Sequence, residues 1–108
     1  MKNYIVFVTA PDINSARLLA RKAVSSKLAA CVNIIPEISS IYLWENEIKD
    51  ESEVQLLFKT SEKCLKNLEK LILDNHPYEV PEFIAIQTDH IEGRYKAWLN
   101  QCLDFNNV

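Results

Sequence analysis

The spacing of hydrophobic residues changes several times along this chain, and the order of those changes limits the possible folds more than any other feature. Short apolar runs rich in β-branched and aromatic residues have the character of strands, whereas longer segments repeat their apolar residues every three or four positions, as amphipathic helices do. The β-type runs are Tyr4–Thr9, Ala29–Ile35, Ile38–Trp44, Val54–Thr60 and Glu82–Thr88, and the helical segments are Asp12–Leu28, Ser61–Leu73 and Asp89–Leu103.

This order is that of a split βαβ fold. The pattern β-α-β-β-α-β, followed by a terminal helix, predicts an α+β, ferredoxin-like sandwich in which a four-stranded antiparallel sheet carries helices on one face. A length of 108 residues without a linker, repeat or low-complexity segment predicts one domain over residues 1–108. The candidate helix N-caps are Asp12 or Ser15, then Ser61, then Asp89 with Glu92 at capping-box spacing.

The two runs on either side of Asn46 predict a hairpin with a long arm. The eleven residues from Ile38 to Ile48 would extend ~36 Å as a strand, whereas a domain of this size has a radius of gyration of ~13 Å. The arm is apolar on both faces, so it needs a cover. A second copy of the chain is one cover, since most soluble assemblies are closed homo-oligomers. Alternatively, a bulge at Pro36 curls the arm back onto its own sheet.

Composition and charge exclude several functions. Twelve basic and fifteen acidic residues are scattered along the chain, and no basic run is long enough to follow a phosphate backbone, so we expect no nucleic-acid partner. We also expect no membrane span and no secretory signal, which makes the cytoplasm the expected location. Three widely spaced cysteines suit reduced thiols better than a disulfide framework.

The single glycine, Gly93, excludes two large classes of site. The Walker loop and the dinucleotide fingerprint each need at least two glycines close together. There is no Cys-x-x-Cys pair, and His76 and His90 are too far apart to share a helical face, so a local zinc site is also excluded. A metal would have to be held by distant segments or by several chains.

The stretch "NHPYEVPEF", residues 75–83, predicts a stiff loop, because each proline holds the preceding residue in an extended conformation. His76 offers an imidazole for metal binding or proton transfer, with Tyr78, Glu79 and Glu82 close enough in sequence to orient it. Alternatively, Pro77 ends the preceding helix and His76 caps its last carbonyls.

Cys31 lies in a predicted buried strand, where cysteine is usually an inert small hydrophobe. A role as thiolate ligand or nucleophile would need a cation nearby, and Lys59 is the candidate. Lys59 and Glu53 should lie on one side of their strand, where they would pair or hold a ligand. Tyr42, Trp44 and Tyr78 are candidates for a ligand cleft or a subunit interface, and Trp98 for the same role.

Six stretches, in this order and spacing, together resemble the CutA family of divalent-cation tolerance proteins, and they cover almost the whole chain. They are "VTAPD" (8–12), "KLAACVNIIP" (27–36), "SIYLWENEI" (40–48), "EVQLLFKT" (53–60), "HPYEVPE" (76–82) and "YKAWL" (95–99).

The resemblance implies a ferredoxin-like homotrimer formed by strand exchange between neighbouring hairpins, similar in architecture to the trimeric PII signalling proteins. It also implies a role in tolerance of copper and other divalent cations, with copper binding in some members. Members with proposed copper ligands have a cysteine where this chain has Val8 and a second histidine where it has Asn75, so only His76 of that set is present. The usual Trp-Glu-Gly of the hairpin is Trp44-Glu45-Asn46 here, and Asn46 tolerates a positive φ.

We therefore predict a cytosolic homotrimer that binds copper or another divalent cation at subunit clefts, with His76, Cys31 and Glu79 as metal ligands and no cofactor needed for folding. The alternative is a trimeric scaffold or signalling protein without a metal-dependent role. No complete catalytic triad can be assembled from the sequence, so we do not expect an enzyme.

Overall fold

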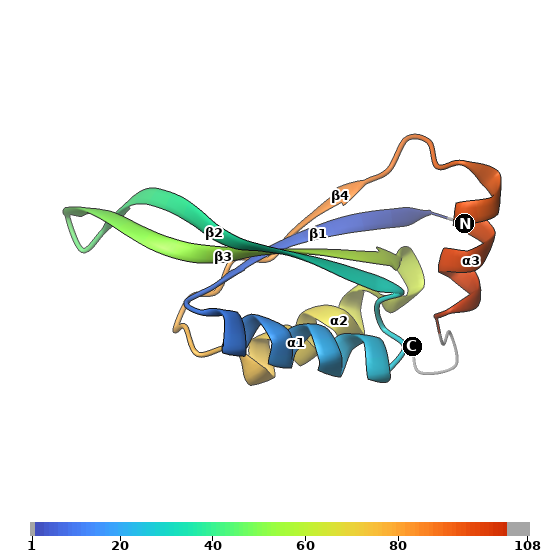
Figure 1. Ribbon diagram of the computed structural model, residues 1–108, viewed down its shortest axis with the longest axis horizontal. Coiled ribbons are helices and arrows are strands. Elements are labelled where there is room, and N and C mark those ends of the chain that lie inside the picture. The colour runs from blue at the N-terminus through green and yellow to red at the C-terminus, as the bar shows by residue number, and fades with distance from the viewer. Residues whose placement is uncertain (1, 104–108) are drawn as a thin grey trace.

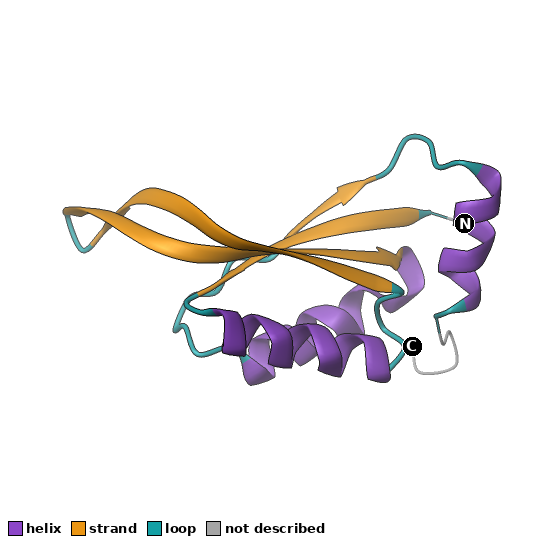
Figure 2. Cartoon of the chain, viewed as in Figure 1, coloured by secondary structure: helices purple, strands orange, loops and turns teal. Residues whose placement is uncertain are grey.

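The computed structural model describes residues 2–103 and contains the predicted α+β architecture (Figures 1 and 2). Its elements are β1 (Asn3–Ala10), α1 (Ile13–Ser25), β2 (Cys31–Trp44), β3 (Glu47–Ser61), α2 (Glu62–Asn75), β4 (Ile84–Gln87) and α3 (Gly93–Gln101). The strands form one sheet in the order β2-β3-β1-β4, and each neighbouring pair is antiparallel. This is the predicted ferredoxin-like arrangement.

Helices α1 and α2 cover one face of the sheet, and the core lies between them and it (Figure 1). Alternate residues of the central strands, among them Val6 and Phe58, point toward the helices and are completely buried. They meet the apolar stripes of α1 and α2, represented by Leu19 and Leu68. Helix α3 lies at one end of the sheet, where the side chain of Asn3 donates a 2.8 Å hydrogen bond to Asn100.

Two helix starts agree with the sequence prediction and one does not. Asp12 caps α1, accepting a 2.7 Å hydrogen bond from the Ser15 N–H, and Ser61 occupies the N-cap of α2, although its side chain makes no capping bond. For α3 the prediction of Asp89 as cap is wrong. Glu92 is the N-cap and accepts from the N–H groups of residues 94 and 95, because the helix begins at Gly93.

The hairpin strands are longer than predicted. β2 continues through Pro36, and the register shifts between Ile35 and Ile38, so that one extra residue bulges out there. The bulge suggested for Pro36 is therefore present, and it lies on an edge strand. The charged residues between the predicted runs Ile38–Trp44 and Val54–Thr60 belong largely to β3, and the turn itself is only Glu45 and Asn46.

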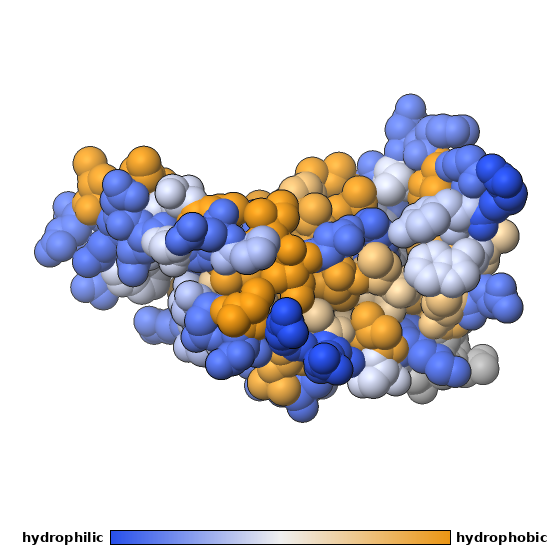
Figure 3. Space-filling view, viewed as in Figure 1, coloured by the Kyte–Doolittle hydropathy of each residue, from blue (hydrophilic) through white to orange (hydrophobic). Residues whose placement is uncertain are grey.

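The hairpin arm projects beyond the helices, as predicted, and gives the molecule dimensions of 44 × 26 × 22 Å (Figure 1). The bulge does not fold it back. Near its tip, Ile41, Leu43 and Ile48 are 70%, 68% and 78% exposed. Figure 3 shows apolar side chains at this tip and in a band over the middle of the molecule.

Candidate functional site

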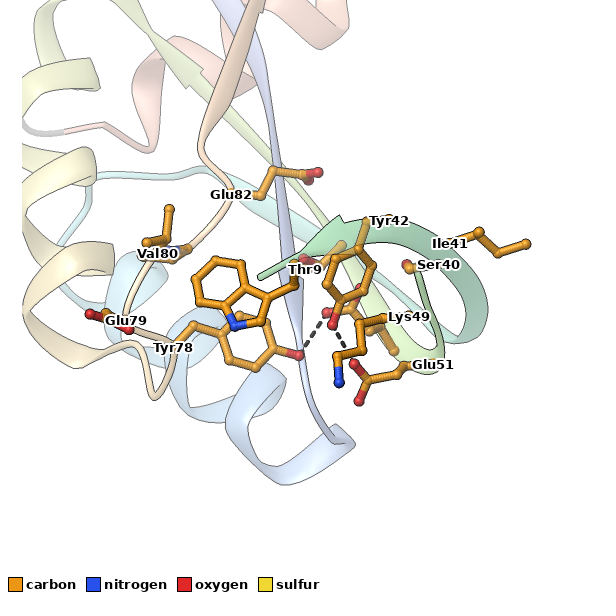
Figure 4. A pocket seen from close by; sticks show the side chains of 13 residues that line it. Thr9, Ser40, Ile41, Tyr42, Lys49, Glu51, Tyr78, Glu79, Val80 and Glu82 are labelled. Carbon is orange, nitrogen blue, oxygen red and sulfur yellow. Dashed lines mark hydrogen bonds between the residues drawn. The ribbon is translucent and has the colours of Figure 1, made fainter. Parts of the chain in front are cut away.

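A cleft of about 690 Å³ lies between the hairpin arm and the loop that follows α2 (Figure 4). The arm contributes Tyr42, Trp44, Lys49, Glu51 and Glu53, and the loop contributes residues 78–82. The loop is stiff because Pro77 and Pro81 favour an extended conformation in the residues before them. The cleft gathers residues predicted from the sequence: Tyr42, Trp44, Tyr78 and Glu79 all line it.

Two tyrosine–carboxylate pairs line the cleft. The Tyr78 hydroxyl donates a 2.6 Å hydrogen bond to Glu53 Oε2 and so links the loop to β3. The Tyr42 hydroxyl donates to Glu51 across the hairpin. The bond to Glu51, helped by burial and the charges of Glu51 and Glu53, raises the pKa of Tyr42 to about 12. Burial first, and then the bond to Glu53, raises the pKa of Tyr78 well above its ordinary value. Both phenols are therefore neutral donors at physiological pH.

The cleft has more negative charge than its own residues balance. Glu53 is only 8% exposed, and among residues 2–103 no Lys, Arg or His lies within salt-bridge distance of it. The Oε2 atom of Glu82 is buried without a hydrogen-bond partner in the same part of the chain. Lys49 also lines the cleft, but its Nζ lies 3.5 Å from Oε2 of Glu47, which is not a cleft residue. Buried carboxylates without a cation are costly, so the cleft is suited to a positively charged ligand.

The structure gives His76 a different set of contacts from those predicted. Its Nδ1 accepts a 3.0 Å hydrogen bond from the Tyr78 N–H, which leaves the proton on Nε2, and Nε2 donates a 2.7 Å bond to the Thr9 carbonyl. Both ring nitrogens are thus engaged, and the ring packs against that of Tyr78 at 4.8 Å. Helix α2 ends at Asn75, just before Pro77, and His76 occupies its C-cap position, as the alternative interpretation predicted. Its side chain does not bind the last carbonyls, because Asn75 Nδ2 makes the bond to Leu71 O and His76 holds the end of β1 instead.

Cys31 and Lys59 are directly opposite each other on β2 and β3, as the sequence suggested. The Lys59 ammonium lies 3.4 Å from the Tyr95 hydroxyl and 5.6 Å from the centre of its ring. Lys59 therefore neither pairs with Glu53 nor lines the cleft. Trp98 also stands apart from the cleft, on α3 beside Tyr95.

The three predicted metal ligands do not meet within one chain. His76 holds β1, Cys31 lies on the sheet opposite Lys59, and Glu79 lines the cleft. Across residues 2–103, no three His, Cys, Asp or Glu side chains are arranged to hold a metal ion. Sequence reasoning missed Glu51 and Lys49, which lie in the charged stretch between the two hairpin runs. Their spacing of two residues was the signal, since it places both on one face of a strand.

Comparison with known proteins agrees with this fold. The model of the family described as "CutA1 divalent ion tolerance protein" matches residues 4–102. The chain belongs to this family. A divalent-cation tolerance protein CutA of Escherichia coli is 38% identical over 99 residues, which are 92% of this chain and 88% of the relative. A mouse Protein CutA is 41% identical over 95 residues, and the chain spans about half, 54%, of its length.

Solved CutA structures superpose closely on the chain. CutA1 from Oryza sativa is 38% identical, with a TM-score of 0.93 over 96% of this chain and 95% of that one. The Thermus thermophilus protein is 35% identical, with a TM-score of 0.91 over 94% and 99%. Membership in the CutA family supports a role in divalent-cation tolerance. None of the helices described between residues 2 and 103 is long and apolar enough to cross a membrane.

Proposed function

We propose that this CutA protein is a cytoplasmic homotrimer that binds copper or another divalent cation at its clefts, and that it acts as a binding protein rather than an enzyme. The observation that carries the proposal is the Glu53 carboxylate, buried in the cleft without a cationic partner among the described residues. A cation bound there would offset a charge that is otherwise costly to bury.

A neighbouring chain is needed to complete a metal site. Glu53, Glu79 and Glu82 offer oxygen ligands, but they are not arranged as a set of three around one point. Copper also favours nitrogen or sulfur ligands, which the carboxylates lack. Cys31, on the sheet face that α1 and α2 leave uncovered, could supply sulfur from a second copy.

Two open sheet edges support the trimer. β2 is one edge of the sheet and β4 is the other, so the β2 edge of one copy can pair with the β4 edge of the next. A head-to-tail contact of this kind forms a closed ring when the rotation between copies allows it, and a trimer is one such ring. The exposed apolar tip of the arm, with Ile41, Leu43 and Ile48, is the kind of surface that such a contact would cover.

One observation favours the alternative, a PII-like scaffold whose trimeric surface is its function: both nitrogens of His76 are engaged in hydrogen bonds. In that case the acidic cleft would contact a partner protein and metal would be irrelevant. A partner complex that survives treatment with a chelator would favour the scaffold.

A calorimetric titration of Cu²⁺ into metal-free protein tests the proposal. We expect saturable binding, weakened about tenfold or more by Glu53→Gln, because a charged ligand group is lost. Cys31→Ser tests the sulfur ligand, and Glu69→Gln, on the exposed side of α2, is the matched control. Light scattering in the same buffer gives the number of chains. Equal Cu²⁺ affinity in wild type and Glu53→Gln would exclude the cleft as the metal site.

A further inference from the structure

The cleft is larger than a site for a bare ion needs to be. Its volume of about 690 Å³ falls within the ~300–1,000 Å³ range that is typical of pockets for small molecules. Within residues 2–103, its carboxylates do not form a group of three that could hold a metal ion. The space between them is therefore suited to a molecule with a body of its own.

The charges of the cleft specify the polar end of that molecule. Glu51, Glu53, Glu79 and Glu82 line the cleft, and the opposing charge is Lys49, which already lies beside Glu47. The phenols of Tyr42 and Tyr78 donate to the carboxylates, so they do not present free hydroxyl hydrogens to a ligand. Anions are repelled here, and a group with several N–H donors and a positive charge would pair with Glu53 and the other carboxylates that line the cleft.

The aromatic side chains specify the rest of the molecule. Trp44, Tyr42 and Tyr78 line the cleft, Tyr42 and Trp44 are partly exposed, and Val80 and Pro81 add apolar surface (Figure 4). Aromatic faces attract organic cations through their negative ring faces and pack against flat apolar groups. A strongly hydrated inorganic ion would use none of this surface.

We propose that the cleft binds a small organic cation, in which an ammonium, amidinium or guanidinium group is attached to a flat apolar body. The cationic group contacts Glu53 and Glu82, and the body lies against Trp44 and the two tyrosines. This inference shares the cleft with the proposed function, but it does not depend on a metal ion.

The test is a calorimetric titration of the 108-residue chain with benzamidine in the presence of EDTA. Tryptophan fluorescence of Trp98→Phe, in which Trp44 is the remaining tryptophan, gives a second readout. We expect saturable binding at one molecule per chain, with benzamide, which has the same shape without the charge, at least about tenfold weaker. Benzoate should not bind.

Variants locate the site. Glu53→Gln and Glu82→Gln should each weaken benzamidine binding about tenfold or more, because a charged hydrogen-bond acceptor is lost. Glu69→Gln should leave it unchanged, and Glu82→Gln keeps the test valid if Glu53→Gln fails to fold.

Three results would overturn the inference: no benzamidine binding, equal binding of benzamide, or unchanged binding in both glutamine variants. If a lysine of a neighbouring chain occupied the cleft, benzamidine would not bind. Because EDTA removes metal, the outcome is independent of the Cu²⁺ titration. Benzamidine binding without Cu²⁺ binding would refute the metal proposal alone. Cu²⁺ binding without benzamidine binding would refute only the organic-cation proposal.

Discussion

Among single residues, Tyr42 makes the most specific prediction, because its pKa is raised from an ordinary value of ~10 to about 12. The folded state then holds the phenolic proton more tightly than the unfolded state does. The resulting stability is fully present below pH ~10 and is lost as the pH rises through about 12. We expect Glu51→Gln to lower the pKa of Tyr42, because the hydrogen bond to a charged acceptor is the largest cause of the shift.

Ultraviolet absorbance of tyrosinate during a pH titration measures the pKa of Tyr42. Tyr42→Phe identifies the contribution of Tyr42 to the curve, and Glu47→Gln, elsewhere on the hairpin, is the control. An identical curve for Glu51→Gln and wild type would show that the Tyr42–Glu51 bond does not form in solution.

His76 makes a prediction about stability. His76→Ala removes the bond to Thr9 O and leaves the Tyr78 N–H without its acceptor, so we expect the free energy of unfolding to fall by roughly 1–3 kcal/mol. Urea denaturation at fixed protein concentration measures the change. The control is His90→Ala, an exposed position where a change of less than about 0.5 kcal/mol is typical. Equal losses at both positions would contradict the structural role of His76.

The role of His76 also shows where sequence reasoning stops. The two prolines made the stiffness of its loop predictable, since they act on neighbouring residues. The partner of Nε2 was not predictable, because it is a backbone carbonyl 67 positions away that any residue type could provide. In the same way, Tyr42, Trp44 and Tyr78 could be named as cleft residues from their chemistry, but the pairing of Tyr78 with Glu53 required the fold.

Among the elements, the hairpin depends on a two-residue turn with unusual backbone angles. Glu45 and Asn46 have φ values of 49° and 64°, the left-handed region that matches the twist of the flanking strands. Asn46→Val should lower the free energy of unfolding by about 1–2 kcal/mol, because a β-branched residue is strained there. Asn46→Gly should be neutral or stabilising. Urea denaturation compares the two, and Ser39→Val, within a strand, is a control for the added side chain. If both valine variants behave alike, strain in the turn is not the cause.

The existence and order of the elements were predictable, whereas several of their ends were not. Hydrophobic spacing identifies an element through its buried face, as in β1 and α1. It fails where a strand has no buried face, and residues 47–52 of β3 are of this kind because that part of the arm extends beyond the core. The start of α3 was misplaced because Asp89 and Glu92 both have side chains that can cap, and tertiary packing decides between them.

At the scale of the whole molecule, the sheet face that α1 and α2 leave uncovered carries apolar side chains. Side chains alternate along each strand, so Ile5, Phe7 and Leu57 point away from the two helices. On the edge strand β4, Ile84 and Ile86 are each 53% exposed. Apolar surface of this kind around an open strand edge favours association, which agrees with the proposed trimer.

This surface gives the last prediction. Replacing both Ile84 and Ile86 by glutamate places two charges where a neighbouring chain would bury them, and an unpaired buried charge costs several kcal/mol. We therefore expect the mass measured by light scattering to fall from that of three chains toward that of one. Leu18→Glu is the matched control, because Leu18 is similarly exposed, at 51%, on α1. If the double variant keeps the mass of the wild type, β4 is not at the interface. If Leu18→Glu also dissociates the protein, the contact involves the helices rather than the sheet edge.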